Sequence, residues 1–214
     1  MLSGSGVDDL LEGLLPRPVW QRYELLGLGA AVARYVELLV RWNGIVSLTS
    51  LRRPEEIVRR HVAESLCCAV ALPVCDRVLD LGSGGGFPGV PVQLMQPEIR
   101  VTLAESHGRK AAFLREVVRE LGLRCEVFGG RAQELEAGRF ECVCLRAVDP
   151  MGQALEAAAA ASSRWICVIG AGLRAGEYDS LLPGWRGEKR CALLDGGGSV
   201  LFTYGRAADV PRGT

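Results

Sequence analysis

The stretch VLDLGSGGGFPG, residues 78–89, decides the fold of this chain. An apolar strand runs into an acidic residue and then into a turn dense in glycine, which adopts positive φ and lets backbone N–H groups approach a ligand. A dinucleotide-binding fingerprint has the form Gly-x-Gly-x-x-Gly, but Phe87 stands where its third glycine belongs. A P-loop ends in Gly-Lys-Ser or Gly-Lys-Thr, whereas Gly89 is followed by Val90. The stretch therefore predicts another kind of ligand-binding loop, between a strand and a helix that begins near Pro88.

The pattern Asp-x-Gly-x-Gly-x-Gly within this stretch is similar to the loop that binds S-adenosylmethionine in class I methyltransferases. The resemblance makes cofactor-binding candidates of the acidic residue and three glycines, namely Asp80, Gly82, Gly84 and Gly86. The glycines would let the backbone approach the methionine part of the cofactor. Phe87 is expected to close the loop against the cofactor, and the alternative is a phenylalanine that packs only into the core.

The next apolar stretch, residues 99–104, is typical of a buried strand and ends at Glu105. Glu105 follows the glycine loop by about 20 residues, where folds of this type place a carboxylate for ribose hydroxyls. We therefore expect Glu105 to bind the cofactor. The alternative is that Glu105 only caps the helix expected over residues 108–121, because acidic side chains are favoured near helix N-termini.

Composition limits what surrounds this site. The 214 residues are 49% hydrophobic with a formal net charge of zero, which suits one domain with a small appendage and argues against a large nonspecific polyanion-binding surface. A local basic patch stays open. No apolar run approaches the 18 or so residues of a membrane span, and the first residues lack a leader pattern, so we expect a cytoplasmic protein without membrane contact.

The eight cysteines form no Cys-x-x-Cys pair and mostly lie inside apolar segments. We expect them to be small buried hydrophobic residues in a reducing compartment, and we expect no metal site.

The order of apolar segments predicts the domain organisation. Helical spacing over residues 20–43 and 54–71 predicts an N-terminal helical cap, residues 1–72. Strands and helices then alternate through residues 73–204, which predicts an α/β, Rossmann-like, mostly parallel sheet, as in class I S-adenosylmethionine-dependent methyltransferases. The sheet should be closed by an antiparallel hairpin of residues 190–194 and 199–204, because three glycines follow Asp195. Residues 205–214 are expected to be a flexible tail, and the protein a monomer.

Six separate blocks resemble the bacterial RsmG (GidB) family over nearly the whole chain. They are residues 41–43 with 48–50, 60–65, 80–91, 105–114, 130–134 and 146–147. The family transfers a methyl group from S-adenosylmethionine to N7 of a guanine in 16S ribosomal RNA. The resemblance therefore implies an S-adenosylmethionine-dependent 16S rRNA (guanine-N7)-methyltransferase whose partner is 16S ribosomal RNA or the small ribosomal subunit.

The resemblance also implies that Ala132, Gln133 and Arg146 contact the cofactor. A backbone N–H and the side-chain amide after the third strand would contact the adenine edge, and the alternative is an ordinary strand-to-helix turn. Arg146 ends an apolar strand at the edge where ligands of open α/β sheets gather, and it is the catalytic candidate. The alternative is an ion pair with Glu105 or Asp80. Since Arg146 projects from a strand end, we expect it to affect turnover more than stability.

The same strand end argues against other methylation chemistries. The segment Arg146-Ala-Val-Asp-Pro-Met differs from the Asn/Asp-Pro-Pro-Tyr loop used on exocyclic amines. Cys142 and Cys144 lie within the strand and are expected in the core, so they do not suit the thiolate nucleophile of cytosine C5 methylation. Guanine N7 has a free lone pair, and a site without an obvious general base suits it.

The substrate-binding candidates lie on the cap. They are Arg52, Arg53 and Arg60, which could meet RNA phosphates together with Arg59, and His61 and Ser65, which lie one helical turn apart. A second basic set is Arg109, Lys110, Arg115 and Arg119. The alternatives are solvated helix faces for the arginines and helix packing for His61.

Two departures from the family concern positive charge: Ile169-Gly170 replaces Lys-Gly, and Gly198-Ser199 replaces Arg-His. They leave open a divergent methyltransferase acting on another RNA or a small molecule, or a non-enzymatic regulator.

Overall fold

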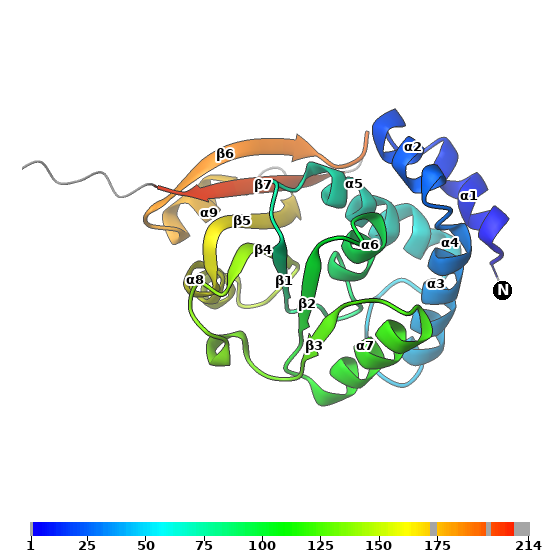
Figure 1. Cartoon of the computed structure of the whole chain (residues 1–214), viewed down its shortest axis with the longest axis horizontal. Helices are drawn as coiled ribbons and strands as arrows, with labels where there is room; N and C mark the ends of the chain where they lie inside the picture. The colour runs from blue at the N-terminus through cyan, green and yellow to red at the C-terminus, as the bar shows by residue number, and fades with distance from the viewer. Residues whose placement is uncertain (1, 172–174, 196–197, 208–214) are drawn as a thin grey trace, which may run out of the picture.

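The computed structural model describes residues 2–171, 175–195 and 198–207. Figure 1 shows a twisted sheet with helices on both sides and the N-terminal helices gathered at one end of the molecule. The N-terminal third contains α1 (Gly4–Glu12), α2 (Arg17–Leu25), α3 (Gly29–Asn43), α4 (Pro54–Ile57), a π-helical turn η1 (Val58–Val62) and α5 (Ala63–Ala71). The rest contains β1 (Arg77–Leu81), α6 (Gly89–Met95), β2 (Arg100–Ala104), α7 (Gly108–Glu120), β3 (Glu126–Phe128), η2 (Ala132–Glu134), β4 (Phe140–Arg146), α8 (Met151–Ala161), β5 (Ser162–Ala171), α9 (Ala175–Leu181), β6 (Trp185–Ala192) and β7 (Ser199–Arg206).

The sheet has seven strands in the order β3-β2-β1-β4-β5-β7-β6. Strands β1 to β5 are parallel to one another, and β7 lies antiparallel between β5 and β6. The predicted mostly parallel sheet closed by an antiparallel hairpin is confirmed. The hairpin is longer than predicted, because β6 begins at Trp185 and β7 continues to Arg206. Most of the predicted tail, residues 208–214, and the turn glycines 196 and 197 lie outside the described residues.

The helices differ from the sequence prediction in two places. The helix predicted over residues 20–43 is two helices, because Gly27 between them has φ 62°, a left-handed conformation that ends a helix. Helix α1 was not predicted, although its N-cap has an ordinary signal: Ser3 Oγ accepts a hydrogen bond from Gly6 N at 3.0 Å. Residues 54–71 are helical as predicted, with the π-helical turn at their centre.

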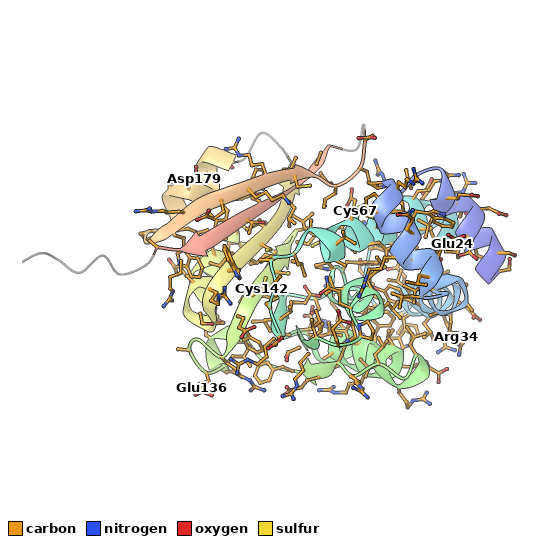
Figure 2. The ribbon with its side chains drawn as sticks, turned by 45° about the horizontal axis from the view of Figure 1, so that its top comes forward. Glu24, Arg34, Cys67, Glu136, Cys142 and Asp179 are labelled. Atoms are coloured by element: carbon orange, nitrogen blue, oxygen red, sulfur yellow. The ribbon has the colours of Figure 1, made fainter. Side chains whose placement is uncertain are left out.

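Two hydrophobic clusters cover the two faces of the sheet. One joins the side chains of α1 to α7 to one face, and the other joins α8 and α9 to the opposite face. The predicted cap therefore shares a core with the sheet, and its predicted boundary at residue 72 falls between α5 and β1. Cys142 and Cys144 are buried, as expected of core residues. In Figure 2 Cys142 lies in the interior, while Glu24, Glu136 and Asp179 lie at the periphery.

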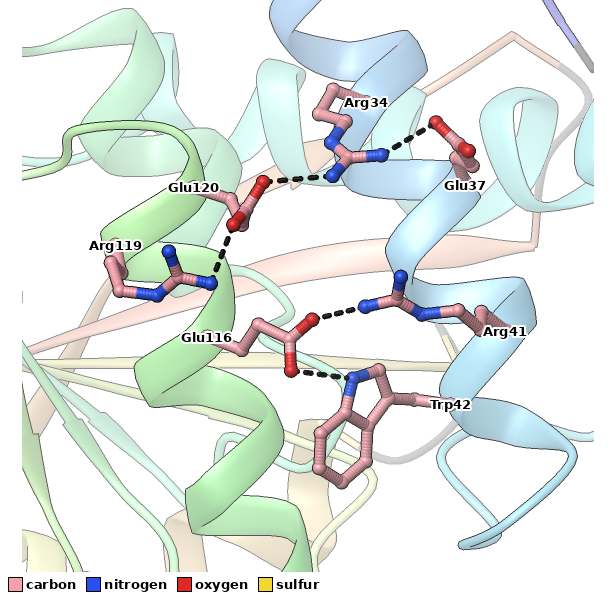
Figure 3. Close-up of polar contacts among 7 residues, drawn as sticks. All are labelled: Arg34, Glu37, Arg41, Trp42, Glu116, Arg119 and Glu120. Carbon is pink, nitrogen blue, oxygen red and sulfur yellow. Dashed lines mark hydrogen bonds and ion pairs between the residues drawn. The ribbon is translucent and has the colours of Figure 1, made fainter.

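A polar seam joins α3 of the cap to α7 beside the sheet (Figure 3). Arg34 bonds Glu37 at 2.9 Å and Glu120 at 2.8 Å, and Glu116 accepts hydrogen bonds from Arg41 and from Trp42 Nε1. Beneath the seam the rings of Trp42 and Phe113 pack 5.9 Å apart. These polar contacts and the ring packing link α3 of the cap to α7.

Candidate functional site

Two adjoining grooves lie at the carboxyl ends of the parallel strands. One, of about 630 Å³, is lined by residues from the cap, the glycine loop and the ends of β4 and β5. The other, of about 380 Å³, is lined by the ends of β1 and β2, the segment 130–133 and the start of α8. The grooves share Gly82, Ser106, Val148 and Asp149. The glycine loop therefore stands between two spaces, at the sheet edge where ligands of α/β folds bind.

The glycine loop depends on backbone conformations that favour glycine. Gly82, Gly84 and Gly86 have φ of 74°, 55° and 90°. A Cβ on Gly84 would have only the Gly82 carbonyl oxygen nearby, at 3.8 Å, so a side chain there would project into open space. Since Gly84 lines the larger groove, that space is the groove itself. The loop thus presents bare backbone to whatever binds.

Asp80 lies beneath the loop and does not line either groove. Its Oδ2 accepts a hydrogen bond from Gly89 N at 3.0 Å, and Oδ1 is buried without a partner among the described residues. Burial raises the pKa of Asp80 to about 7, against the opposing effects of the Gly89 N–H and of Arg146. A cation bound above the loop would stabilise the ionised carboxylate.

Glu105 connects the loop to the next strand. Its Oε2 accepts a hydrogen bond from Gly84 N at 2.9 Å, and its Oε1 accepts one from His107 N at 2.8 Å. The residue is 8% exposed and lines the larger groove. The carboxylate therefore supports the loop and the start of α7 together, and a contact with ribose stays a prediction.

The lining of the smaller groove includes the apolar residues Leu81, Ala104 and Ala157, together with Ala132 and Gln133. Ala132 and Gln133 belong to the 3₁₀ turn η2 that follows β3. A groove lined by both apolar and polar groups suits a heterocycle such as adenine. The contact of Ala132 and Gln133 with the cofactor stays a prediction.

Arg146, the last residue of β4, belongs to a largely buried polar network. Its Nη2 donates to Glu64 Oε2 at 2.6 Å and to His61 Nδ1 at 2.9 Å. Ser199 Oγ donates to Glu64 Oε1 at 2.8 Å, and His61 Nε2 lies 2.8 Å from Thr49 Oγ1. The network joins the cap, β4 and β7 around the larger groove.

The tautomer of His61 follows from this network. An arginine N–H can only donate, so Nδ1 accepts, and Nε2 carries the ring proton that it donates to Thr49. Burial lowers the pKa of His61 to about 4, with further effects of Arg146 and Arg60, so the ring is neutral near pH 7. Phe87 packs 5.0 Å from the His61 ring, and its ring centroid lies 5.8 Å from Arg146 Cζ. Phe87 is thus part of this packed group as well as a lining residue of the groove.

The loop between α3 and α4 forms a roof over the groove and is shaped by Asn43. Asn43 Oδ1 accepts hydrogen bonds from the backbone of Leu48 and Thr49, and Nδ2 donates to the carbonyls of Thr49 and Leu51. Leu48, Thr49 and Ser50 line the groove. Asn43 therefore fixes the hydroxyl of Thr49 where His61 meets it.

Several predicted residues have another role than expected. The ion-pair partner of Arg146 is Glu64, not Glu105 or Asp80. Because the two side chains are only 15% and 12% exposed, we expect Arg146 to contribute to stability as well. Ser65 is fully buried and its hydroxyl donates to the His61 carbonyl at 2.6 Å, so it offers RNA no free surface. The sequence prediction missed Glu64, whose signal was an acidic residue among the apolar residues of α5.

The cap arginines lie at the surface. Arg52, Arg53 and Arg60 are exposed, as is Arg59, around the start of α4 and on the π-helical turn. Lys110 lines the larger groove. The surface thus leaves these side chains open to RNA phosphates, and the contact stays a prediction. Among the residues described, no cluster of histidine, cysteine or acidic side chains suits a metal ion, and no helix is both long and apolar enough to cross a membrane.

The arrangement fits S-adenosylmethionine, the predicted cofactor. A bare glycine backbone, a buried carboxylate oxygen beneath it without a partner among the described residues, and a groove of mixed apolar and polar lining next to it suit a ligand with a cationic part and a planar base. Gly82, Gly84 and Gly86 with Phe87 would hold its methionine part, and the smaller groove its adenine.

Known structures share this fold. A predicted O-methyltransferase from Agrobacterium tumefaciens aligns with a TM-score of 0.56 and 19% identity, over 69% of this chain and 81% of that chain. The magnesium protoporphyrin IX methyltransferase from Synechocystis, solved with S-adenosylmethionine bound, aligns with a TM-score of 0.56 and 17% identity over 78% and 89%. At these identities the likeness concerns the fold alone, and it is that of class I methyltransferases.

Sequence comparison gives the family. The family described as GidB, rRNA small subunit methyltransferase G, matches residues 29–166. The ribosomal RNA small subunit methyltransferase G of Stenotrophomonas maltophilia is 47% identical over 133 residues, 59% of this chain but only 62% of that protein, which is less than two thirds of its length. The protein of that name from Xanthomonas campestris is 35% identical over 182 residues, 77% of this chain and 85% of that protein. The chain therefore belongs to the family of ribosomal RNA small subunit methyltransferase G.

Proposed function

We propose that this protein transfers a methyl group from S-adenosylmethionine to N7 of a guanine in the 16S RNA of the small ribosomal subunit. The observation that carries the proposal is the larger groove, where the bare glycine loop faces a guanidinium held by Glu64 and His61. Family membership supports the substrate, since the relatives are named ribosomal RNA small subunit methyltransferases. Because the proposed substrate belongs to the small ribosomal subunit, we also propose that this protein acts in the cytoplasm.

The cofactor supplies a methyl group on a sulfonium, a good leaving group. Transfer of this methyl group to N7 would break its bond to sulfur as the bond to nitrogen forms, and the positive charge would pass from the sulfonium to the purine. Guanine N7 attacks with its own lone pair, so no proton has to be removed. The neutral His61 is consistent with this, because it accepts from Arg146 and is not free to act as a base.

The role of the chain is therefore to position the base. Arg146 uses Nη2 for Glu64 and His61, while its other nitrogens have no partner among the described residues. Guanine O6 lies beside N7 and accepts hydrogen bonds from arginine. A contact from Arg146 to O6 alone would leave N7 free and aim it at the methyl group. Such positioning can lower the barrier by about 7–11 kcal/mol.

The roof of the groove favours a nucleic-acid substrate over a small apolar one. A small-molecule methyltransferase should have an apolar roof from the N-terminal helices, whereas Thr49, Ser50 and His61 accompany Leu48 here. The exposed arginines next to this roof suit phosphates.

The test is methyl transfer from tritiated S-adenosylmethionine to 16S RNA and to small subunits purified from cells that lack this protein. Incorporation should saturate at one methyl group per RNA. Subunits from cells that contain the protein should accept none, because their site is already methylated. No incorporation into either unmodified substrate would refute the proposed function.

A further inference from the structure

A row of arginines lies at the sheet edge opposite the cofactor-binding edge. Parallel strands begin there, and β7, which runs antiparallel, ends there. The arginine edge consists of Arg77, Arg100, Arg139, Arg164, Arg186 and Arg206. Arg77 is the register partner of Arg100 on the neighbouring strand. Like charges that face each other across strands repel, so a bound polyanion would stabilise this edge.

The acidic residues at this edge only partly balance it. Glu126 pairs with Arg139 at 3.0 Å. Glu141 accepts a hydrogen bond from Asp76 N at 2.6 Å and lies near Arg77 and Arg164. Glu188 lines a groove at the β5–β7 part of this edge. Arg77, Arg100, Arg164 and Arg206 have no ion-pair partner within 4.0 Å among the described residues, so the edge keeps free positive charge.

A groove of about 640 Å³ opens at the β5–β7 part of this edge. Arg164 Cζ lies 5.9 Å from the ring centroid of Trp165, and Arg206 Cζ lies 5.3 Å from that of Trp185. Arg206 Nη2 donates to the Ala159 carbonyl at 3.2 Å, which fixes this guanidinium beside the ring, while its other N–H groups have no hydrogen-bond partner among the described residues. Trp165 Nε1 is buried without an acceptor among the residues described, and a Cβ on Gly205 would lie 2.9 Å from the Trp165 ring. Guanidinium groups beside aromatic rings are the features of a groove that binds a single-stranded nucleic acid.

The distance to the cofactor shows which nucleotides could bind here. Strand β5 has 10 residues, and at about 3.3 Å per residue it separates the two edges by roughly 30 Å. One target nucleotide cannot reach both. The row from β2 to β7 spans four strand spacings of about 4.8 Å, or roughly 19 Å, which can accompany several phosphates of one strand.

We propose that the arginine edge binds ribosomal RNA away from the target guanine, with a single-stranded nucleotide in the groove between Arg164 and Arg206. The proposal rests on the proposed function for the identity of the RNA. It explains why a chain of zero net charge concentrates arginines at an edge that takes no part in cofactor binding.

The test is the salt dependence of binding to protein-free 16S RNA between about 50 and about 200 mM salt. Arg164→Gln and Arg206→Gln should each lower the slope of log affinity against log salt by about 0.7–0.9, and the double variant by about twice that. Arg17→Gln is the matched control, because Arg17 is an exposed arginine on α2 in the cap and its loss changes the net charge equally. Affinity for S-adenosylmethionine and melting temperature should stay those of wild type.

Unchanged slopes in the edge variants, or an equal loss in Arg17→Gln, would overturn the proposal. Weaker binding to whole subunits with unchanged binding to protein-free RNA would overturn it too, since the partner would then be a ribosomal protein. Methyl transfer by wild type is measured in parallel. Edge-dependent binding without any methyl transfer would refute the proposed function and leave the edge as an RNA-binding surface, whereas transfer with unchanged slopes would refute only the edge.

Discussion

Replacement of Arg146 by alanine should destabilise the protein as well as stop methyl transfer. Arg146 Nη2 lies 2.6 Å from Glu64 Oε2, and the two side chains are only 15% and 12% exposed. Removal of one partner from a buried ion pair costs about 3–5 kcal/mol, because the remaining charge is left without compensation. Since water can reach part of this pair, we expect about 3 kcal/mol. For a chain of this size that lowers the melting temperature by roughly 6–12 °C.

The assay is thermal unfolding followed by circular dichroism at pH 8. Glu64→Gln added to Arg146→Ala should recover about half of the loss, because an amide does not need a counter-charge. Arg100→Ala is the control, since Arg100 is also a strand arginine but is exposed, and it should melt within about 2 °C of wild type. If Arg146→Ala melts that close to wild type, or if the double variant is less stable than Arg146→Ala, the buried pair does not stabilise the fold.

Three further predictions concern the cofactor loop, its buried carboxylate and the cap. Gly84→Val should abolish S-adenosylmethionine binding in calorimetry, while Gly122→Val, at a similar φ of 61° but with open space around it, should bind normally; equal binding by both would contradict the loop assignment. Burial raises the pKa of Asp80 from 3.8 to about 7, so the folded state holds a proton that the unfolded chain releases, and stability falls as pH rises from about 4 to 7. Urea unfolding should therefore give a free energy of unfolding for Asp80→Asn, relative to wild type, that is more favourable at pH 8 than near pH 4 by up to about 4 kcal/mol. The same difference between variant and wild type at both pH values would contradict the raised pKa. Arg53→Gln with Arg60→Gln should flatten the salt dependence of RNA binding by about 1–2 units, and an unchanged slope would mean that the cap arginines are only solvated.

The sequence predicted the parts of the fold that local patterns control. Strand and helix alternation and the glycine loop each depend on residues close together in the chain. The helix over residues 20–43 was wrong because one glycine in a left-handed conformation at position 27 outweighs helical periodicity. The π-helical turn that carries His61 has no such local signal.

The polar network at Arg146 could not be predicted in the same way. Arg146 meets Glu64 across 82 residues and His61 across 85, while Ser199 meets Glu64 across 135. Contacts of that separation depend on how α5, β4 and β7 converge, and sequence spacing does not carry this information. The sequence alone therefore presents Ser199 only as a departure from a basic family residue, whereas in the structure its hydroxyl donates a hydrogen bond to Glu64.

The most direct test of the central claim is to locate the methyl group on the RNA. Methylation of N7 gives guanine a positive charge, so borohydride reduction followed by aniline cleaves the RNA strand at the modified nucleotide. Unmodified 16S RNA incubated with this protein and S-adenosylmethionine should be cleaved at one guanine, and no cleavage should occur when Gly84→Val replaces wild type. Methyl incorporation without any such cleavage would show that another atom is methylated, and would contradict the account of N7 attack guided by Arg146.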